Sequence, residues 1–140
     1  MKILLAVDGS PISLNAAKFV AKLAKQLAKP PVVILFNADP PLMQAVAAKL
    51  GTQAATKYHA DNGEHAIKAS RTVLRRARLA FTEKLVVGEP APSIIKAAKA
   101  ERCDLVAMGS HGHGAVKNLF VGSVAAKVIA QGAVPVVVAR

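Results

Sequence analysis

Aliphatic runs alternate with segments of helical periodicity along this chain of 140 residues. The runs are short and almost uninterrupted, which is the pattern of strands buried on both faces of a parallel sheet; the clearest span residues 2–7, 32–36 and 104–108. Between them, apolar residues recur at three- and four-residue spacing, as they do on an amphipathic helix. Strands that alternate with helices predict an α/β fold in three layers, with helices on both faces of a parallel sheet.

Two further strands complete the predicted sheet. Residues 79–87 contain Thr82, Glu83 and Lys84, and this polar centre predicts a strand at the sheet edge. Residues 134–139 begin with a proline at the second position, which also indicates an edge or a strand margin. No repeat, linker or low-complexity tract interrupts the chain, so we predict a single domain that spans residues 1–140.

Helical periodicity is clearest in two segments. From Ile12 to the Pro30-Pro31 stop, it places Phe19 on the buried face together with Ala16, Val20, Leu23 and Leu27. In residues 62–78, it turns Ala66, Ala69, Val73, Leu74 and Ala77 inward. Residues 42–57 have poor caps and are interrupted by Gly51, so we expect one or two short helical pieces there.

Composition narrows the class of protein. Hydrophobic residues make up 53% of the chain but aromatic residues only 4%, which predicts a core of Val, Ile, Leu and Ala. The single Cys103 excludes an internal disulfide framework and a zinc site built from cysteines, and a small buried residue is its favoured role. No apolar run reaches the length of a membrane span and no signal-peptide pattern opens the sequence, so we expect a cytoplasmic protein.

A glycine-rich stretch follows the fourth predicted strand and precedes a predicted helix. Gly109, Gly112 and Gly114 allow backbone N–H groups to approach a ligand closely. Gly122 and Ser123 stand at the predicted helix start, where unpaired N–H groups and the positive dipole end favour phosphate. A plain turn explains the three glycines but not the pair at the helix start, so we interpret the stretch as a nucleotide phosphate site. Its GxxGxG order matches neither a Walker loop nor GxGxxG.

The spacing of these glycines resembles a family signature. Gly109, two residues, Gly112, nine residues and Gly122-Ser123 look like the nucleotide-binding motif of the universal stress protein family, in its ATP-binding branch. The segments ILLAVDGS, VGEPAPSII, CDLVAMGSHGHG and VPVVVAR also resemble that family, so the resemblance covers the chain from end to end. It implies a Rossmann-like fold of the adenine nucleotide alpha hydrolase-like type, with strand order 3-2-1-4-5. Strands 1 and 4 then meet at the topological switch point, where ligands bind beyond the carboxyl ends of strands.

The candidate site lies at those strand ends. Asp8 either caps a turn or serves the nucleotide by accepting hydrogen bonds from a ribose or holding Mg²⁺ carried by the phosphates, and the resemblance favours the nucleotide role. The resemblance also places Ala38 against adenine through its backbone atoms. The predicted nucleotide-binding residues are Asp8, Gly9, Ser10, Ala38, Met108, Gly109, His111, Gly112, His113, Gly122, Ser123 and Val124.

Metal ligation and catalysis find little support in the residues. His111 and His113 lack a third ligand at useful spacing, so we expect them to line the phosphate loop or face solvent. There is no G-x-S-x-G elbow and no evident group to position an attacking water. The resemblance therefore implies a regulatory, stress-response module that binds ATP with Mg²⁺, and the lack of a catalytic group favours binding over catalysis. A slow ATPase or self-phosphorylating enzyme on the same fold is one alternative, and a basic interaction protein with a lapsed nucleotide site is another.

The net charge and the family resemblance both indicate which kinds of partner the protein could bind. Nineteen Lys and Arg against eight Asp and Glu give a formal net charge of +11, which favours anionic partners without identifying them. A basic stripe at helical spacing consists of Lys68, Arg71, Arg75 and Arg78. The default interpretation of such a stripe is a face exposed to solvent. The alternative is a surface that binds nucleic acid or polyphosphate. Nucleic acid is not expected, because no aromatic platform accompanies the stripe. The resemblance implies a homodimer, for which the apolar residues 134–138 are the expected contact, and an unidentified protein partner.

Overall fold

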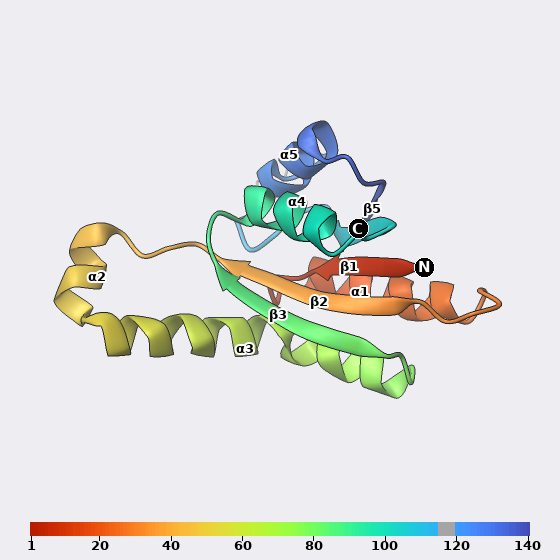
Figure 1. Cartoon of the computed structure of the whole chain (residues 1–140), viewed down its shortest axis with the longest axis horizontal. Helices are drawn as coiled ribbons and strands as arrows, with labels where there is room; N and C mark the ends of the chain where they lie inside the picture. The colour runs from red at the N-terminus through yellow and green to blue at the C-terminus, as the bar shows by residue number, and fades with distance from the viewer. Residues whose placement is uncertain (115–119) are drawn as a thin grey trace.

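A computed structural model describes residues 1–114 and 120–140 of the chain (Figure 1). Five strands form one sheet in which every pairing between described strands is parallel, and the order is β3-β2-β1-β4-β5. The predicted α/β fold and strand order are therefore confirmed. Along the chain the elements are β1 (Lys2–Ala6), α1 (Pro11–Ala24), β2 (Val32–Asp39), α2 (Gln44–Leu50), α3 (Thr52–Arg76), β3 (Phe81–Val87), α4 (Pro90–Ala100), β4 (Leu105–Gly109), α5 (Ser123–Gln131) and β5 (Val136–Ala139).

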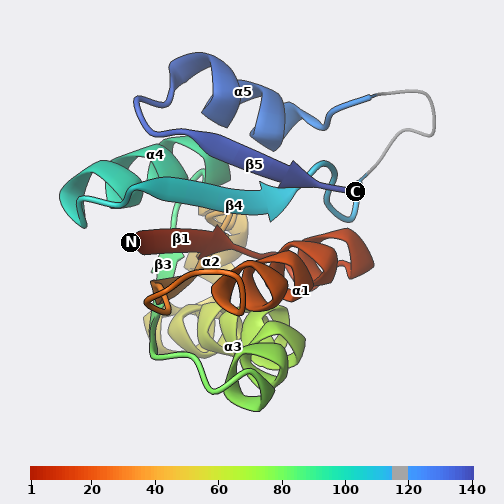
Figure 2. The same cartoon turned by 90° about the vertical axis from the view of Figure 1, so that its right-hand side faces the viewer.

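Helices cover both faces of the sheet, as Figure 2 shows: α1 and α3 lie on one face, and α4 and α5 on the other. The chain moves from β1 through β2 to β3 in one direction and from β4 to β5 in the opposite one. Because crossovers between parallel strands are right-handed, this reversal sends the two sets of helices to opposite faces. The connections that leave β1 and β4 therefore diverge, and an opening forms beyond the carboxyl ends of these neighbouring strands.

The central strand β1 supplies both hydrophobic cores. Successive side chains of a strand point to opposite faces, so Ile3 and Leu5 pack with α1 and α3, whereas Leu4 packs with α4 and α5. All three side chains are fully buried. β3 and β5 lie at the sheet edges. This was predicted for β3 from its polar centre and for β5 from Pro135.

Helix α1 ends earlier than predicted, and the face it buries is only partly the predicted one, since Ala16 and Val20 are buried as predicted and Leu23 packs against the core. It stops at Ala24, before the Pro30-Pro31 pair, so Leu27 lies outside it. The prediction that Phe19 faces the core was wrong, since this side chain is 38% exposed. Besides Ala16 and Val20, the buried face contains the small residues Ser13, Ala17 and Ala24, which were not predicted. Small side chains let the helix lie close to the sheet, and this close packing favours the row without the bulky Phe.

Helix α3 is longer than predicted and starts at Thr52 instead of Asn62. Gly51, with φ of 83°, separates it from α2, so the predicted break is present but the second predicted piece belongs to the long helix. The prediction that Ala69 faces inward was also wrong; the buried residues are Gly63, Ala66, Ile67, Ser70 and Leu74. The start of α3 and the whole of α2, which buries none of its residues, extend beyond the sheet as an arm (Figure 1).

Ionic groups outside the core are tied in specific pairs. Arg71 of α3 donates to Glu64 Oε2 at 2.7 Å and to Glu83 Oε2 of β3 at 2.9 Å. The hydrogen bond from Arg71 holds the pKa of Glu64 below its usual value, while Glu64 and Glu83 in turn raise the pKa of Arg71. Cys103 is buried as predicted, and its burial raises the pKa of the thiol. None of the helices in the described ranges is long and apolar enough to cross a membrane.

The core packing of α3 leads to a stability prediction. Leu74→Ala removes a fully buried side chain from the core between α3 and the sheet, so the free energy of unfolding should fall by about 2–5 kcal/mol. Leu50→Ala in α2 is the matched control, because Leu50 is 44% exposed and its truncation should change that free energy by less than about 0.5 kcal/mol. Urea denaturation monitored by circular dichroism compares the two variants. Equal losses of stability would contradict the packing described for α3.

Candidate functional site

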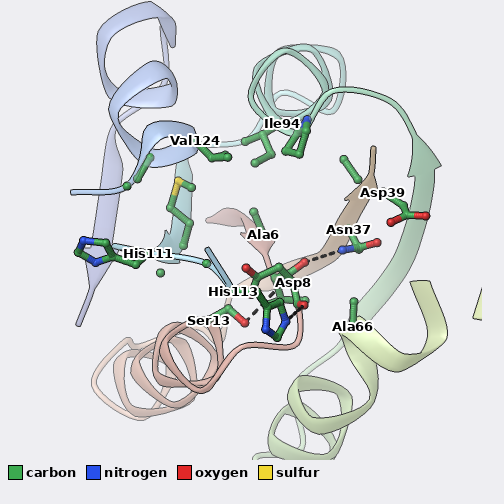
Figure 3. A pocket seen from close by; sticks show the side chains of 18 of the residues that line it. Ala6, Asp8, Ser13, Asn37, Asp39, Ala66, Ile94, His111, His113 and Val124 are labelled. Atoms are coloured by element: carbon green, nitrogen blue, oxygen red, sulfur yellow. Dashed lines mark hydrogen bonds between the residues drawn. The ribbon is translucent and has the colours of Figure 1, made fainter. Parts of the chain in front are cut away.

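A cavity of about 650 Å³ opens at the carboxyl ends of β1, β2 and β4, at the switch point of the sheet. Its volume lies within the roughly 300–1,000 Å³ typical of small-molecule sites. Figure 3 shows Asp8 and His113 close together, opposite Val124 and Ile94. The wall thus combines polar groups from the turn after β1 and the glycine loop with apolar groups from α4 and α5.

Asp8 lines the cavity with its two carboxylate oxygens in different surroundings. Oδ1 accepts a hydrogen bond from the backbone N–H of Ser10 at 2.9 Å, which is the turn-capping role considered for this residue. Oδ2 lies against the glycine loop, because a Cβ built on Gly112 would approach it to 2.4 Å. A side chain at position 112 would therefore displace the carboxylate. While it caps this turn, Asp8 still lines the cavity, so the turn-capping role and the nucleotide-binding role predicted for it are compatible.

The two histidines of the glycine loop bind to different partners. His113 Nε2 donates to the backbone oxygen of Asp8 at 2.8 Å, which joins the loop to the turn after β1. His111 Nδ1 forms a hydrogen bond of 2.9 Å with the hydroxyl of Ser110. Within residues 1–114 and 120–140, no group of three His, Cys, Asp or Glu side chains is arranged to hold a metal ion.

The far end of the glycine loop returns to the strand end and begins α5. The N–H of Gly122 donates to the carbonyl of Ser110 at 2.6 Å, and a Cβ at position 122 would lie 3.1 Å from that same oxygen. Gly122 caps α5 without a side-chain hydrogen bond, and Ser123 is the first helical residue, as predicted. The first N–H groups of α5 therefore have no side-chain acceptor at the cap and lie beside the cavity.

The structure brings almost all of the predicted site residues to this one cavity. Gly9 and Ser10 are the exceptions, because neither lines it. Ser10 is buried and serves as the N-cap of α1, where its hydroxyl accepts from the N–H of Ser13 at 3.1 Å. Gly9 lies in the same turn, against Ala66 of α3. The middle of the predicted loop, residues 115–119, lies outside the described residues.

Ala38 reaches the cavity from a strand that is longer than predicted. The second strand was expected to end at Phe36, but β2 continues to Asp39 because β3 extends alongside it as far as Val87. β1 accompanies β2 only as far as Phe36. The last residues of β2 thus have a strand on one side and the cavity on the other.

Sequence reasoning missed the wall that α3 contributes. Asn62, His65 and Ala66 line the cavity, and Asn62 Nδ2 donates to Asp39 Oδ2 at 3.1 Å. His59 Nδ1 also contacts Asp39 Oδ2, so two α3 side chains hold the end of β2. Asn37 was missed as well; it is buried and donates to the backbone oxygen of Val7 at 2.8 Å. A polar residue at the end of an aliphatic run was the available signal for Asn37, whereas the α3 contacts left none.

Fold and cavity define this chain as a doubly wound α/β protein with a glycine-loop site at its switch point. A family model described as the universal stress protein family matches residues 1–140. The chain belongs to the universal stress protein family. Among its relatives, universal stress protein MJ0531 of Methanocaldococcus jannaschii is 27% identical over 139 residues, which cover 99% of this chain and 81% of that protein.

Solved structures of the same family share the fold. The structure of protein MJ0577 is 26% identical, has a TM-score of 0.80, and covers 99% of this chain and 94% of its own. A universal stress protein from Archaeoglobus fulgidus in complex with dAMP is 21% identical over 100% of this chain and 98% of its own, with a TM-score of 0.69. A universal stress protein in complex with cAMP is 19% identical over 100% and 97%, with a TM-score of 0.72.

Asn37 offers a test of how the cavity floor is held. Asn37→Leu removes the donor to Val7 O and leaves that carbonyl without its side-chain partner in a buried place, so the free energy of unfolding should fall by about 1–3 kcal/mol. Asn15→Ala is the control: Asn15 donates to the exposed backbone oxygen of Arg140, where water replaces the side-chain donor. Chemical denaturation measures both variants, and a fully stable Asn37→Leu protein would refute the role of this bond.

Proposed function

We propose that this chain binds an adenine nucleotide, ATP with Mg²⁺, in the switch-point cavity and acts as a nucleotide-dependent regulatory module in the cytoplasm. One observation carries the proposal. The turn after β1, the end of β2, the glycine loop and the start of α5 come from separate parts of the sequence, yet they enclose a single cavity of ligand size. The adenine nucleotides named in the structures of the two family members support the choice of base.

The end of β2 offers backbone groups for the base. In a parallel ladder, the N–H and C=O of alternate residues point to the same side of the strand. Phe36 O accepts from Val7 N on the β1 side, whereas Asp39 O accepts from Gly88 N on the β3 side. Ala38 is two residues after Phe36, so its N–H and C=O point to the same side as those of Phe36. On that side β1 has already ended and the cavity lies open. One donor and one acceptor on a single residue match the edge of an adenine ring.

The start of α5 and the Asp8 turn suit the remainder of the nucleotide. Backbone N–H groups at the start of α5 and the positive end of the helix dipole favour phosphate oxygens. The Asp8 carboxylate lies across the cavity from α5, where it suits a ribose hydroxyl or a phosphate-bound Mg²⁺. A ligand that contacts both ends joins the turn after β1 to α5, and a partner protein would sense the surface that this bridge fixes.

Isothermal titration calorimetry with ATP and Mg²⁺ tests the nucleotide site. Gly122→Val should abolish binding, because the added side chain crowds Ser110 O at the entry to α5 and displaces the first N–H groups of the helix. Asp8→Ala should weaken binding by about tenfold or more, the cost of one hydrogen bond to a charged group.

Ala126→Val is the matched control for the glycine variant, since Ala126 is exposed on α5 and does not line the cavity. It should keep the affinity of the unmodified protein, and thermal melting should show that both variants fold. Absence of heat for every purine nucleotide with the unmodified protein, or unchanged affinity in Gly122→Val, would refute the proposal.

We further propose a homodimer in which β5 pairs with its copy across the sheet edge. Val106 N donates to Pro135 O and Ser110 N to Ala139 O, so the groups of residues 135, 137 and 139 point to β4. Those of Val136 and Val138 consequently point to the outer edge of the sheet, where no described strand pairs with β5 and apolar side chains suit a second strand.

Proline at position 138 tests this edge, because it removes an outward N–H without removing a bond to β4. Sedimentation equilibrium should give about twice 14.5 kDa for the unmodified protein and the single-chain mass for Val138→Pro. Val87→Pro is the control on the opposite edge, at an exposed β3 position whose N–H points away from β2 by the same alternation, and it should remain dimeric. A monomeric unmodified protein at micromolar concentration would exclude the dimer.

A further inference from the structure

The outer surfaces of α1 and α3 form a single basic face. These helices lie side by side on the same side of the sheet (Figure 2) and pack against each other. The exposed cations of both helices, together with Lys25 at the C-cap of α1, define what we call the basic face: Lys18, Lys22, Lys25, Lys68, Arg75 and Arg76. Lys29 and Arg78 extend it just beyond the helix ends.

The cations of the two helices occupy equivalent positions. The buried residues of α1 and of the second half of α3 follow the same spacing, from Ser13 to Ala24 and from Gly63 to Leu74. Because the spacing repeats, Lys18 corresponds to Lys68 and Lys25 to Arg75 relative to the sheet. The face therefore carries two similar rows of cations on neighbouring helices whose axes are about 8–10 Å apart in typical packing.

Acidic residues are scarce near this face, although Glu64 interacts with two of its cations, Lys68 and Arg75. α1 contains none, and α3 has none after Glu64, which Arg71 binds together with Glu83. The six other acidic side chains lie elsewhere: in the cavity wall, as the cap of α4, or against Lys57, Lys84 or the backbone N–H of Lys2; these are Asp8, Asp39, Asp61, Glu89, Glu101 and Asp104. Among the described residues, none of the six cations of the basic face forms an ion pair.

This segregation of charge goes beyond what a solvated face requires. A surface that is only solvated carries both signs interspersed, and mixing them relieves self-repulsion. Here Glu64 lies close enough to Lys68 and Arg75 to attract them, but Arg71 already binds this carboxylate, so most of the repulsion among the six cations is uncompensated and is relieved when a polyanion binds. The sequence alone shows basic stripes on two separate helices; the fold joins them on one side of the molecule.

We propose that the basic face binds the phosphate backbone of double-stranded nucleic acid. Two phosphate chains border each groove of a duplex. The minor and major grooves of B-DNA are about 6 and 12 Å wide, and the separation of the α1 and α3 axes lies between these two widths. Long Lys and Arg side chains reach phosphates on either side without reading bases. Binding is therefore independent of sequence and depends strongly on salt.

The apolar content of the face distinguishes a duplex from other polyanions. Within α1 and residues 65–76 of α3, Phe19 is the one large apolar side chain that is exposed. A single-strand site needs several aromatic side chains for base stacking, and a membrane-surface helix needs an apolar face to insert. Neither is present in these described segments, whereas a duplex backbone requires only the cations.

Fluorescence anisotropy with a labelled DNA duplex of about 20 base pairs and random sequence tests the proposal. Between about 50 mM and 200 mM potassium chloride, six phosphate contacts should give a slope near −5 for the logarithm of the association constant against that of salt. The triple variant Lys18→Gln, Lys25→Gln and Arg75→Gln should weaken binding by about tenfold or more and make the slope less negative by about three, one for each cation that no longer meets a phosphate.

The matched control removes the same charge from the opposite side of the sheet. Lys96, Lys99 and Lys127 are exposed on α4 and α5, and their joint replacement by Gln should weaken binding by less than about threefold. Circular dichroism establishes that both triple variants keep the fold. The proposal fails if both triples weaken binding equally, if the unmodified protein shows no saturable binding at the lower salt, or if it binds phosphatidylglycerol vesicles or single strands more tightly than the duplex.

Discussion

The burial of β1 on both faces is the constraint from which the rest of the structure follows. Its aliphatic side chains alternate between two cores, so helices must cover both sides of the sheet. As the middle strand, β1 is also hydrogen-bonded on both edges, to β2 and to β4. The connections that leave β1 and its neighbour β4 run over opposite faces of the sheet, and the cavity opens where they diverge. The cavity is therefore a consequence of how β1 is buried.

The features that could be predicted from the sequence are those that local residues encode. Aliphatic runs predicted the strands, and the glycines with Gly122-Ser123 predicted a loop that enters a helix. Strand order came from the family resemblance, because pairing between distant strands leaves no local trace. The errors at Phe19 and Ala69 arose because several faces of a helix can be similarly apolar in the sequence. In α1 the sheet packs against a row of mostly small side chains and excludes Phe19, whereas in α3 it packs against the face that carries Ile67 and Leu74 and leaves Ala69 exposed.

The same distinction separates the predicted from the missed parts of the site. Asp8 and the glycine loop directly follow strands, so their position at the switch point is encoded beside them in the chain. The α3 wall depends on His59 and Asn62, which bind Asp39 from 20 and 23 residues further along the chain. It also depends on α3 starting at Thr52, well before its predicted start at Asn62. Contacts of this kind are specified by tertiary packing and are invisible to periodicity.

Helix α1 serves both proposed binding surfaces without bringing them together. Its first turn lies at the cavity, where Ser13 contributes to the wall and Ser10 caps the helix. The cations lie on its outer face, and Lys25 is about 18 Å along the axis from Ser13. A nucleotide and a duplex would therefore contact different parts of one rigid element. Helix α3 likewise lines the cavity with His65 and carries Lys68 of the basic face. Because both helices pack tightly on the sheet, an influence of one ligand on the other passes through a shift of α1 or α3 as a whole.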